Sequence, residues 1–328
     1  MGRKRSAVSR IAVSVSALCI ALATGGAATA QSYPARPVRM LAPAVGGGVE
    51  IVARLLALKV SASLGQQFIV DNRPAGGGVV AAQTLATARP DGHTLLFFGA
   101  PIWLLPLLRT NLPYDLQRDF APVMMAVSFP AVLVVHSSVP ANSVNELIAL
   151  AKSRPGQLNA AISGTASAPH LSLELLKAMT GINVTLIPYN GVGPTVMAVV
   201  GAQADFTMPV LTAAMPHIRS GKLRALAVAS AQPTALAPGL PTIAASGVPG
   251  YESEAWGALF APAGTPPAIV SLLNQEFSKA LRLPEVREFM ANAGAEVHAT
   301  SPQGAVTIMR NEVAKWGKLI REAGIREN

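Results

Sequence analysis

Hydrophobic positions in the first third of the chain alternate between short continuous runs and longer stretches with helical spacing. Residues 50–64 place Ile51, Leu55 and Leu58 on one helix face, and Gly65 ends that stretch. Short apolar runs bounded by Gly and Pro predict strands on either side of it. The predicted strands are 38–41, 68–70 and 94–98, and a second helix is predicted at 79–88. This order favours a parallel βαβ unit whose ligand loops follow the carboxyl ends of the strands.

The middle of the chain repeats the same alternation of strand and helix signals. The predicted strands there are 131–135, 158–162, 184–187, 205–208 and 223–229. The predicted helices are 144–152, 170–179 and 195–200. Both halves are therefore predicted to be doubly wound α/β units.

The last third changes character. Residues 231–250 are rich in Pro, Gly and Ala without periodicity, a strand is predicted at 256–260, and three amphipathic helices begin at Ala268, Pro284 and Pro302. Because these helices lack a sheet of their own, we expect them to pack on the first module. The chain would then cross between two lobes near Phe129 and again near Trp256, as in a hinged protein. The predicted division is a leader at 1–30, a discontinuous first lobe at 31–130 plus 256–328, and a second lobe at 131–255.

The first thirty residues have the three parts of a secretory signal peptide. Residues 3–5 are basic, residues 11–23 form an apolar run, and residues 28–30 read Ala-Thr-Ala, an A-x-A cleavage site. An uncleaved membrane anchor is the alternative, but the apolar run is shorter than the roughly 20 residues that a spanning helix requires. We expect the mature chain to begin near Gln31 and to be exported to the periplasm.

Composition narrows the possible functions. The chain is 51% hydrophobic and 13% charged, which excludes a disordered protein. Four of the 26 Lys and Arg lie in the predicted leader, so 22 basic residues face 17 acidic ones in the mature chain, a net charge of +5. That mild charge, without a basic run, argues against a nucleic-acid partner and is compatible with a small anionic ligand. The single cysteine, Cys19, also lies in the leader, and the five histidines show no metal-binding spacing, so neither a metal nor a cofactor is predicted.

Three loops rich in Gly and small residues carry the candidate chemistry. They lie at residues 44–50, 163–170 and 189–195, each between a predicted strand and a predicted helix. Backbone N–H groups at such a helix start form a site for a carboxylate or a phosphate. None of the loops matches a dinucleotide or Walker motif, and glycine that only serves a tight turn is the alternative for each loop taken singly.

Catalytic residues are hard to find in the same loops. Ser163 or Ser167 beside His170 is the nearest arrangement to a nucleophile and base, but the segment is not a G-x-S-x-G elbow and no acid is marked. His170 is interpreted as a loop-bracing or ligand-contacting residue, or as an ordinary helix-start residue. Tyr189 and Trp256 are candidates for pocket walls, although aromatic residues in apolar segments are more often core.

Several ordered segments resemble one family. APAVGGGVEIVAR at 42–54 and DNRPAGGG at 71–78 resemble the opening of the tripartite tricarboxylate transporter substrate-binding proteins, the Bug family of periplasmic solute receptors. Further matches follow in the family's order: NLPYD at 111–115, His170-Leu171 with Glu174-Leu175, PYNG at 188–191, GKLRALAV at 221–228 and APAGTP at 261–266. The similarity extends from about Tyr33 to Gly324.

This resemblance implies a type II periplasmic binding protein, a two-lobed α/β Venus flytrap whose lobes are mixed sheets flanked by helices. Such a receptor is not an enzyme; it closes on a small organic carboxylate and delivers it to the membrane subunits of a tripartite transporter, most simply as a monomer. The ligand-binding residues it implies are Ala44, Val45, Gly46, Gly47 and Glu50 in the first lobe and Ser163, Thr165, Ser167, His170, Tyr189 and Gly191 in the second. Glu50 stands where the family usually has Asp, and Val45 where it usually has Ala or Gly, so the pocket should have its own ligand preference.

Two other functions are compatible with the sequence. A signalling receptor that presents the closed lobes to a sensor kinase would have the same fold and loops. A serine-dependent acyl hydrolase would use Ser163 or Ser167 and is the weaker alternative.

Overall fold

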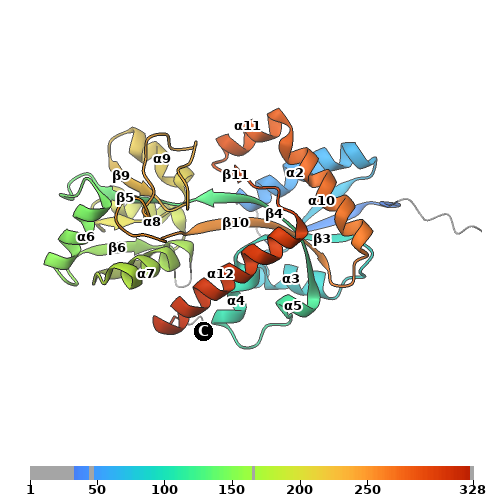
Figure 1. Cartoon of the computed structure of the whole chain (residues 1–328), viewed down its shortest axis with the longest axis horizontal. Helices are drawn as coiled ribbons and strands as arrows, with labels where there is room; N and C mark the ends of the chain where they lie inside the picture. Colours follow the sequence, from blue (N-terminus) through green and yellow to red (C-terminus); the bar gives the residue numbers. More distant parts are fainter. Residues whose placement is uncertain (1–32, 44–47, 165–166, 326–328) are drawn as a thin grey trace, which may run out of the picture. The chain divides into compact units, whose positions relative to one another are not determined.

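A computed structural model describes residues 33–43, 48–164 and 167–325 of the chain. The predicted leader lies outside the described residues, as do positions 44–47, 165 and 166 in the predicted ligand loops. Two β-sheets and their helices make up the compact unit that begins at Arg36 (Figure 1).

The first sheet is mixed and combines early and late parts of the chain. Its strand order is β11-β4-β10-β3-β1-β2. The strands are β1 Val38–Ala42, β2 Phe68–Asn72, β3 Thr94–Gly99, β4 Phe120–Pro130, β10 Glu254–Pro262 and β11 Glu296–Val297. β1 runs parallel to β2 and β3, whereas β10 is antiparallel to both β3 and β4, and β11 is antiparallel to β4.

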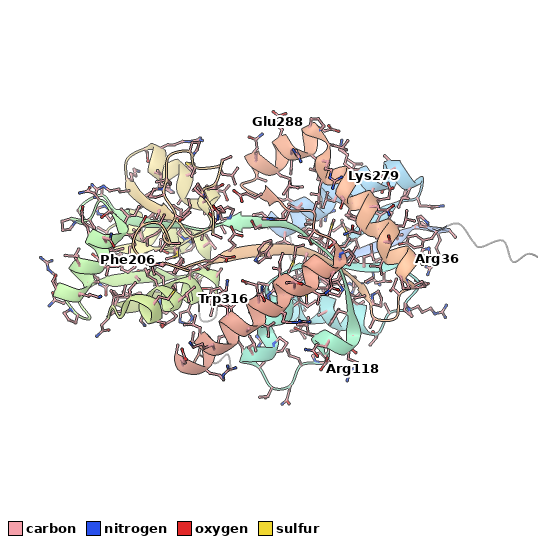
Figure 2. The ribbon with its side chains drawn as sticks, viewed as in Figure 1. Arg36, Arg118, Phe206, Lys279, Glu288 and Trp316 are labelled. Atoms are coloured by element: carbon pink, nitrogen blue, oxygen red, sulfur yellow. The ribbon has the colours of Figure 1, made fainter. Side chains whose placement is uncertain are left out.

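Helices cover both faces of this sheet (Figure 1). α2 Gly48–Leu64 and α10 Pro267–Arg282 pack together on one face, and α11 Pro284–Asn292 follows α10. The other face carries α3 Val79–Ala86, α4 Pro101–Leu108 and α12 Pro302–Glu322, with α5 Leu116–Asp119 nearby. Since successive side chains of a strand point to opposite faces, Leu96 and Phe98 of β3 lie on the same face. They pack in the core beneath α12 together with Trp316 of that helix (Figure 2).

The second sheet has the order β7-β6-β8-β5-β9. Its strands are β5 Val132–His136, β6 Asn159–Ile162, β7 Thr185–Pro188, β8 Phe206–Thr207 and β9 Leu223–Val228. β6 is parallel to β7 and β8, and β5 is antiparallel to β8 and β9. One buried cluster contains residues of α6 Val144–Ser153 and α7 Ala168–Thr180, and another contains residues of α8 Val192–Val200 and α9 Leu211–Arg219. Alternate residues of β5 enter the two clusters, as expected for a strand buried on both faces.

Two connections join the sheets. β4 of the first sheet ends at Pro130 and the chain enters β5 at Val132, while β9 ends at Val228 and the chain returns to the first sheet in β10 at Glu254. Because β4 and β10 are hydrogen-bonded neighbours and Glu254 pairs with Pro130, the two connections leave the first sheet side by side. The fold is therefore a two-lobed α/β architecture, as the sequence predicts.

Several elements are absent from the sequence prediction. They include the helices α4, α5 and α9 and the strands β4 and β11. α4 is apolar on all sides and contains Pro106, so it lacks a helical period. α9 has helical spacing but contains Pro216, and proline disfavours a helix interior. β4 is buried along most of its length and therefore lacks polar alternation. Within the described residues, none of the helices combines the length and the apolar character that a bilayer span needs.

Candidate functional site

The carboxyl ends of β1, β2 and β3 converge at one edge of the first sheet, as expected for parallel strands. The segments that follow these strands meet there, and we call residues 43, 48–50, 71–78 and 99–101 the first loop edge. A Cβ on Gly78 would lie 2.3 Å from the Phe98 ring and 2.8 Å from Cβ of Pro43, and Gly78 has a φ of +95°. Only glycine fits this position, because both the backbone conformation and the space exclude a side chain.

The start of α2 rests on the two strands that connect the sheets. A Cβ on Gly48 would lie 2.9 Å from the ring of Phe129, which belongs to β4. Gly99 at the end of β3 is equally confined, since its Cβ would lie 2.7 Å from the carbonyl oxygen of Trp256 in β10 and 3.8 Å from Val49. The first turn of α2 is thus fixed directly against the crossing strands.

Charges at the first loop edge are paired. The Glu50 carboxylate is buried in the first turn of α2 and accepts a hydrogen bond from Nε of Arg54. Arg54 also donates to Oδ1 of Asn72 at 2.6 Å. The predicted ligand residue Glu50 therefore has an arginine partner within its own helix, and this pairing limits its repulsion of an anion.

A second ion-pair group lies at the end of β2. Asp71 accepts from Nε of Arg39 at 2.6 Å and from Nε of Arg73 at 3.2 Å. Arg73 thus pairs with an acid two residues earlier in the chain. Arg39, Arg54 and Arg73 therefore all form ion pairs with carboxylates near this edge. Backbone N–H groups are then the main donors that the edge could offer to an anion.

The second sheet presents a corresponding edge, which comprises residues 163–164, 167–170 and 189–195 and is called the second loop edge. Ser163 and Gly164 follow β6, and Ser167 is the N-cap of α7, its hydroxyl accepting a hydrogen bond from the backbone N–H of His170 at 3.3 Å. The His170 ring is buried, with Nε2 3.9 Å from Glu174, and burial lowers its pKa. His170 is therefore a neutral side chain at neutral pH.

α8 begins at the same edge. Tyr189 follows β7, and its N–H donates to the carbonyl of Ile162 at the end of β6. Gly191 is the N-cap of α8 with a φ of +99°, and no side chain caps this helix. The hydroxyl of Thr195, which is fully buried, donates to the Gly191 carbonyl at 2.8 Å and fixes the turn. The N–H groups of Val192 and Gly193 are in the first turn of α8 and point along its N-terminal axis.

The described site residues thus fall into two groups. Glu50 lies at the first loop edge, and Ser163, Ser167, His170, Tyr189 and Gly191 share the second. Ala44, Val45, Gly46, Gly47 and Thr165 lie outside the described residues. Leu171 in the first turn of α7 shares a buried cluster with Trp256, so α7 reaches the core that underlies the first loop edge. Trp256 is itself core, with 6% of its surface exposed.

The serine–histidine arrangement does not have catalytic geometry at Ser167. Its hydroxyl accepts the main-chain N–H of His170, which is a helix cap and not a nucleophile–base contact. Within the part of the chain that the structure describes, no three His, Asp or Glu side chains gather as metal ligands.

Sequence reasoning missed one polar cluster. Ser128 in β4 is completely buried, and its Oγ lies 2.8 Å from Nε2 of His298. The His298 ring packs on Trp256 with 4.8 Å between ring centroids, and Glu254 lies nearby at the start of β10. These residues come from segments up to 170 positions apart, so no local pattern marks them.

The chain resembles known proteins over almost its full length. Residues 52–325 match the family described as the tripartite tricarboxylate transporter family receptor. Protein BugT of Bordetella pertussis is 36% identical over 313 residues, which cover 94% of this chain and 96% of BugT. A protein encoded in the tcbD-tcbE intergenic region of Pseudomonas sp. is 33% identical over 314 residues, or 95% of this chain and 94% of that protein.

Solved structures show the same similarity. Rpa4515 of R. palustris, solved with adipate, is 36% identical with a TM-score of 0.76 and covers 90% of this chain and 99% of its own. MatC of Rhodopseudomonas palustris, solved with bound malate, is 32% identical with a TM-score of 0.72, and the match covers 88% of this chain and all of MatC.

Proposed function

The chain belongs to the tripartite tricarboxylate transporter receptor family, and from that membership we propose that it captures a small organic acid with two carboxylate groups between its lobes. The family resemblance expected from the sequence is confirmed, and with it the interpretation as a periplasmic substrate-binding receptor, which is not an enzyme. The two lobes are proposed to be 31–130 plus 256–328 and 131–255, with ligand held where the loop edges face each other.

One observation carries the proposal: both loop edges offer helix N-termini on which anionic side chains are absent or paired. At the first edge Glu50 is neutralised by Arg54. At the second edge the start of α8 carries no side-chain cap. A carboxylate is bound well by first-turn N–H groups and the helix dipole. Two such positions, one per lobe, fit an acid with a carboxylate at each end.

The known relatives support this ligand class. Adipate and malate, the ligands named for two related structures, are both dicarboxylates. Glu50 and Val45 distinguish this chain from the usual family pattern, so its preferred dicarboxylate has its own length and substitution. We propose residues 44–47, Glu50, Ser163, Thr165, Ser167, His170, Tyr189 and Gly191 as its contacts.

The test is a thermal-shift screen of refolded mature protein against mono-, di- and tricarboxylates, followed by calorimetry. A ligand at 100 times its dissociation constant adds about 2.7 kcal/mol of stability. The sharpest comparison is the best dicarboxylate against its monomethyl ester, which has the same body and one carboxylate fewer. We expect the ester to bind about 10- to 100-fold more weakly, because charge-assisted hydrogen bonds at one end are lost. Equal affinity of acid and ester, or no carboxylate hit, would contradict the proposal.

Delivery to a membrane transporter is the second part of the proposal. We propose that the monomeric receptor, exported by cleavage of residues 1–30, presents its closed form to the membrane subunits of a tripartite transporter. Deleting the gene should abolish uptake of the radiolabelled ligand, and supplying the mature protein to the periplasm should restore it. Uptake that is unaffected by the deletion would contradict a transport role.

A further inference from the structure

Four polar or aromatic side chains share one face of the first sheet where the chain crosses to the second. Ser128 of β4 is directly opposite Trp256 of β10 and, on its other side, opposite Glu296 of β11. Glu254 lies two residues before Trp256. Since opposite residues, and residues two apart in a strand, point to the same face, Glu254, Ser128 and Glu296 are neighbours on that face.

Ser128 lies between the other polar groups of this face. Its Oγ lies 2.8 Å from Nε2 of His298, and the strand register places the Glu254 carboxyl on the same face, where the nearby Ser128 hydroxyl favours the ionised carboxylate and lowers its pKa. His298 is braced by ring contact with Trp256. Because a hydroxyl has one proton to donate, Ser128 donates either to Glu254 or to His298, and the protonation state of the carboxyl decides which.

The surroundings of Glu254 are rich in negative charge. Glu296, Glu252 of the preceding segment, and Glu312 of α12 all repel its ionised form. Lys315 is a cation close to these carboxylates. It pairs with Glu312 at 2.5 Å and donates to the Glu252 carbonyl, so its hydrogen bonds go to groups other than Glu254. Burial and the neighbouring carboxylates raise the pKa of Glu254 to about 7, while burial lowers the pKa of His298 and keeps it neutral.

We propose that Glu254, Ser128 and His298 form a proton-binding site at the crossing between the lobes, and that proton binding there is coupled to lobe closure. In the ionised state Ser128 donates to the Glu254 carboxylate and accepts from Nε2–H of His298. A proton taken from solvent binds the carboxyl, which then donates to Ser128. Ser128 turns to donate to Nε2, while His298 releases its Nε2 proton to solvent and takes one at Nδ1, which gives the neutral Nδ1–H tautomer. One proton is gained in all.

The position of Glu254 explains the coupling. It is the first residue of β10 and pairs with Pro130, the last residue of β4. The neighbouring Ser253 is hydrogen-bonded through its hydroxyl to Ser172 of α7 at 2.6 Å, and α7 begins at the second loop edge. A rotation of the second lobe therefore moves backbone next to Glu254 and changes its distance from Glu296 and its access to water. By linkage, protonation must then shift the closure equilibrium.

The proton site is tested first without ligand. A raised pKa means that the folded chain binds more protons than the unfolded chain between pH 4.5 and about 7, so stability falls as pH rises through that window and stays lower above it. Glu254→Gln imitates the protonated carboxyl. We expect it to raise the melting temperature by several degrees at pH 8.5 and to leave it unchanged at pH 4.5.

Glu288→Gln on the exposed surface of α11 is the matched control and should change neither value (Figure 2). Ser128→Ala removes the donor to the ionised Glu254 carboxylate. It should move the midpoint of the pH-dependent fall in stability to a higher pH than in the wild type. Nitrogen NMR of His298 should show the tautomer change with the same midpoint in the wild type and no change in Glu254→Gln. A melting difference independent of pH, or a single His298 tautomer throughout, would overturn the site.

Coupling to closure is measured separately. The predicted mature chain has no cysteine, so cysteines introduced at the exposed positions Leu58 and Lys152 can carry labels, one on each lobe. The ligand-free distance distribution should change between pH 5.5 and 8.5 in the wild type and in Glu288→Gln, and should be constant in Glu254→Gln. An unchanged wild-type distribution would refute the coupling.

Only the expected effect on ligand binding rests on the proposed function. Calorimetry in buffers of different ionisation enthalpy should detect proton uptake or release on dicarboxylate binding near pH 7 in the wild type and none in Glu254→Gln. Absence of any binding heat would contradict the proposed ligand class, whereas binding without proton exchange would contradict the coupling alone.

Discussion

Both loop edges present little unbalanced charge, but they do so by different means. The first contains several charges that are paired, Glu50 with Arg54 and Asp71 with Arg39 and Arg73. The second holds the neutral groups Ser167, His170 and Gly191. Anion affinity should therefore respond to charge substitutions at the first edge and to backbone substitutions at the second.

The largest effect is expected from removing one backbone donor at the second edge. Gly193 is the second residue of α8, and a Cβ there meets nothing within 4 Å. Gly193→Pro deletes its N–H, and losing a hydrogen bond to a charged group should weaken dicarboxylate binding about 10- to 100-fold. Gly193→Ala keeps the N–H and serves as the control, with affinity within about twofold of wild type. Calorimetry that found both variants equal would show that this amide does not contact the ligand.

Arg54→Met should have the next largest effect, at the first edge. It leaves the buried Glu50 carboxylate without its arginine, next to the expected carboxylate of the ligand. We expect affinity to fall about fivefold to tenfold, since like charges near a surface repel by about 1 kcal/mol or more. Adding Glu50→Gln in the same chain should restore it. If the double variant binds as weakly as Arg54→Met, the loss came from altered packing and not from charge.

Asp71→Asn should act in the opposite direction. It releases Arg39 and Arg73 from their shared carboxylate. Affinity for a dicarboxylate should rise about twofold to threefold at low salt, and the gain should disappear at 1 M salt, where the Debye length is about 3 Å. Titrations at two salt concentrations measure this. A gain that persisted at high salt would exclude long-range electrostatics as its cause.

The smallest effect concerns His170. Burial lowers its pKa, so the unfolded chain binds more protons than the folded chain just below pH 6.5, and stability is lost as pH falls through that region. In His170→Asn the fall in melting temperature across this pH region should be smaller by a few degrees. Below pH 6 the wild type and the variant should converge in stability or cross. If the melting temperatures of the wild type and the variant changed in parallel from pH 8 to 5, His170 would not titrate in this range.

Much of the fold was predictable from local patterns. The helical spacing in 50–64, the apolar run at 131–135 and the Gly- and Pro-bounded connections gave the element order and the two lobes. α4 and β4 were missed because uniform apolarity removes the period on which prediction depends, and α9 was missed because its internal proline argues against a helix. The loops named as candidate sites do lie at helix starts, since N-cap and glycine signals are local, and their role in ligand binding stays a prediction.

The sequence by itself determined that this chain is a receptor of a recognisable family, with Gly-rich loops before helix starts and no thiol in the predicted mature protein. These properties depend on residues close together in the chain, where periodicity, caps and turns act. Tertiary structure alone decided that Gly48 lies against Phe129, that Glu50 is buried, and that Glu254, Ser128 and His298 meet beside Trp256. The pairing of β4, β10 and β11 brings segments from three distant parts of the chain to one face, and the charge of a group depends on the neighbours that such pairing supplies.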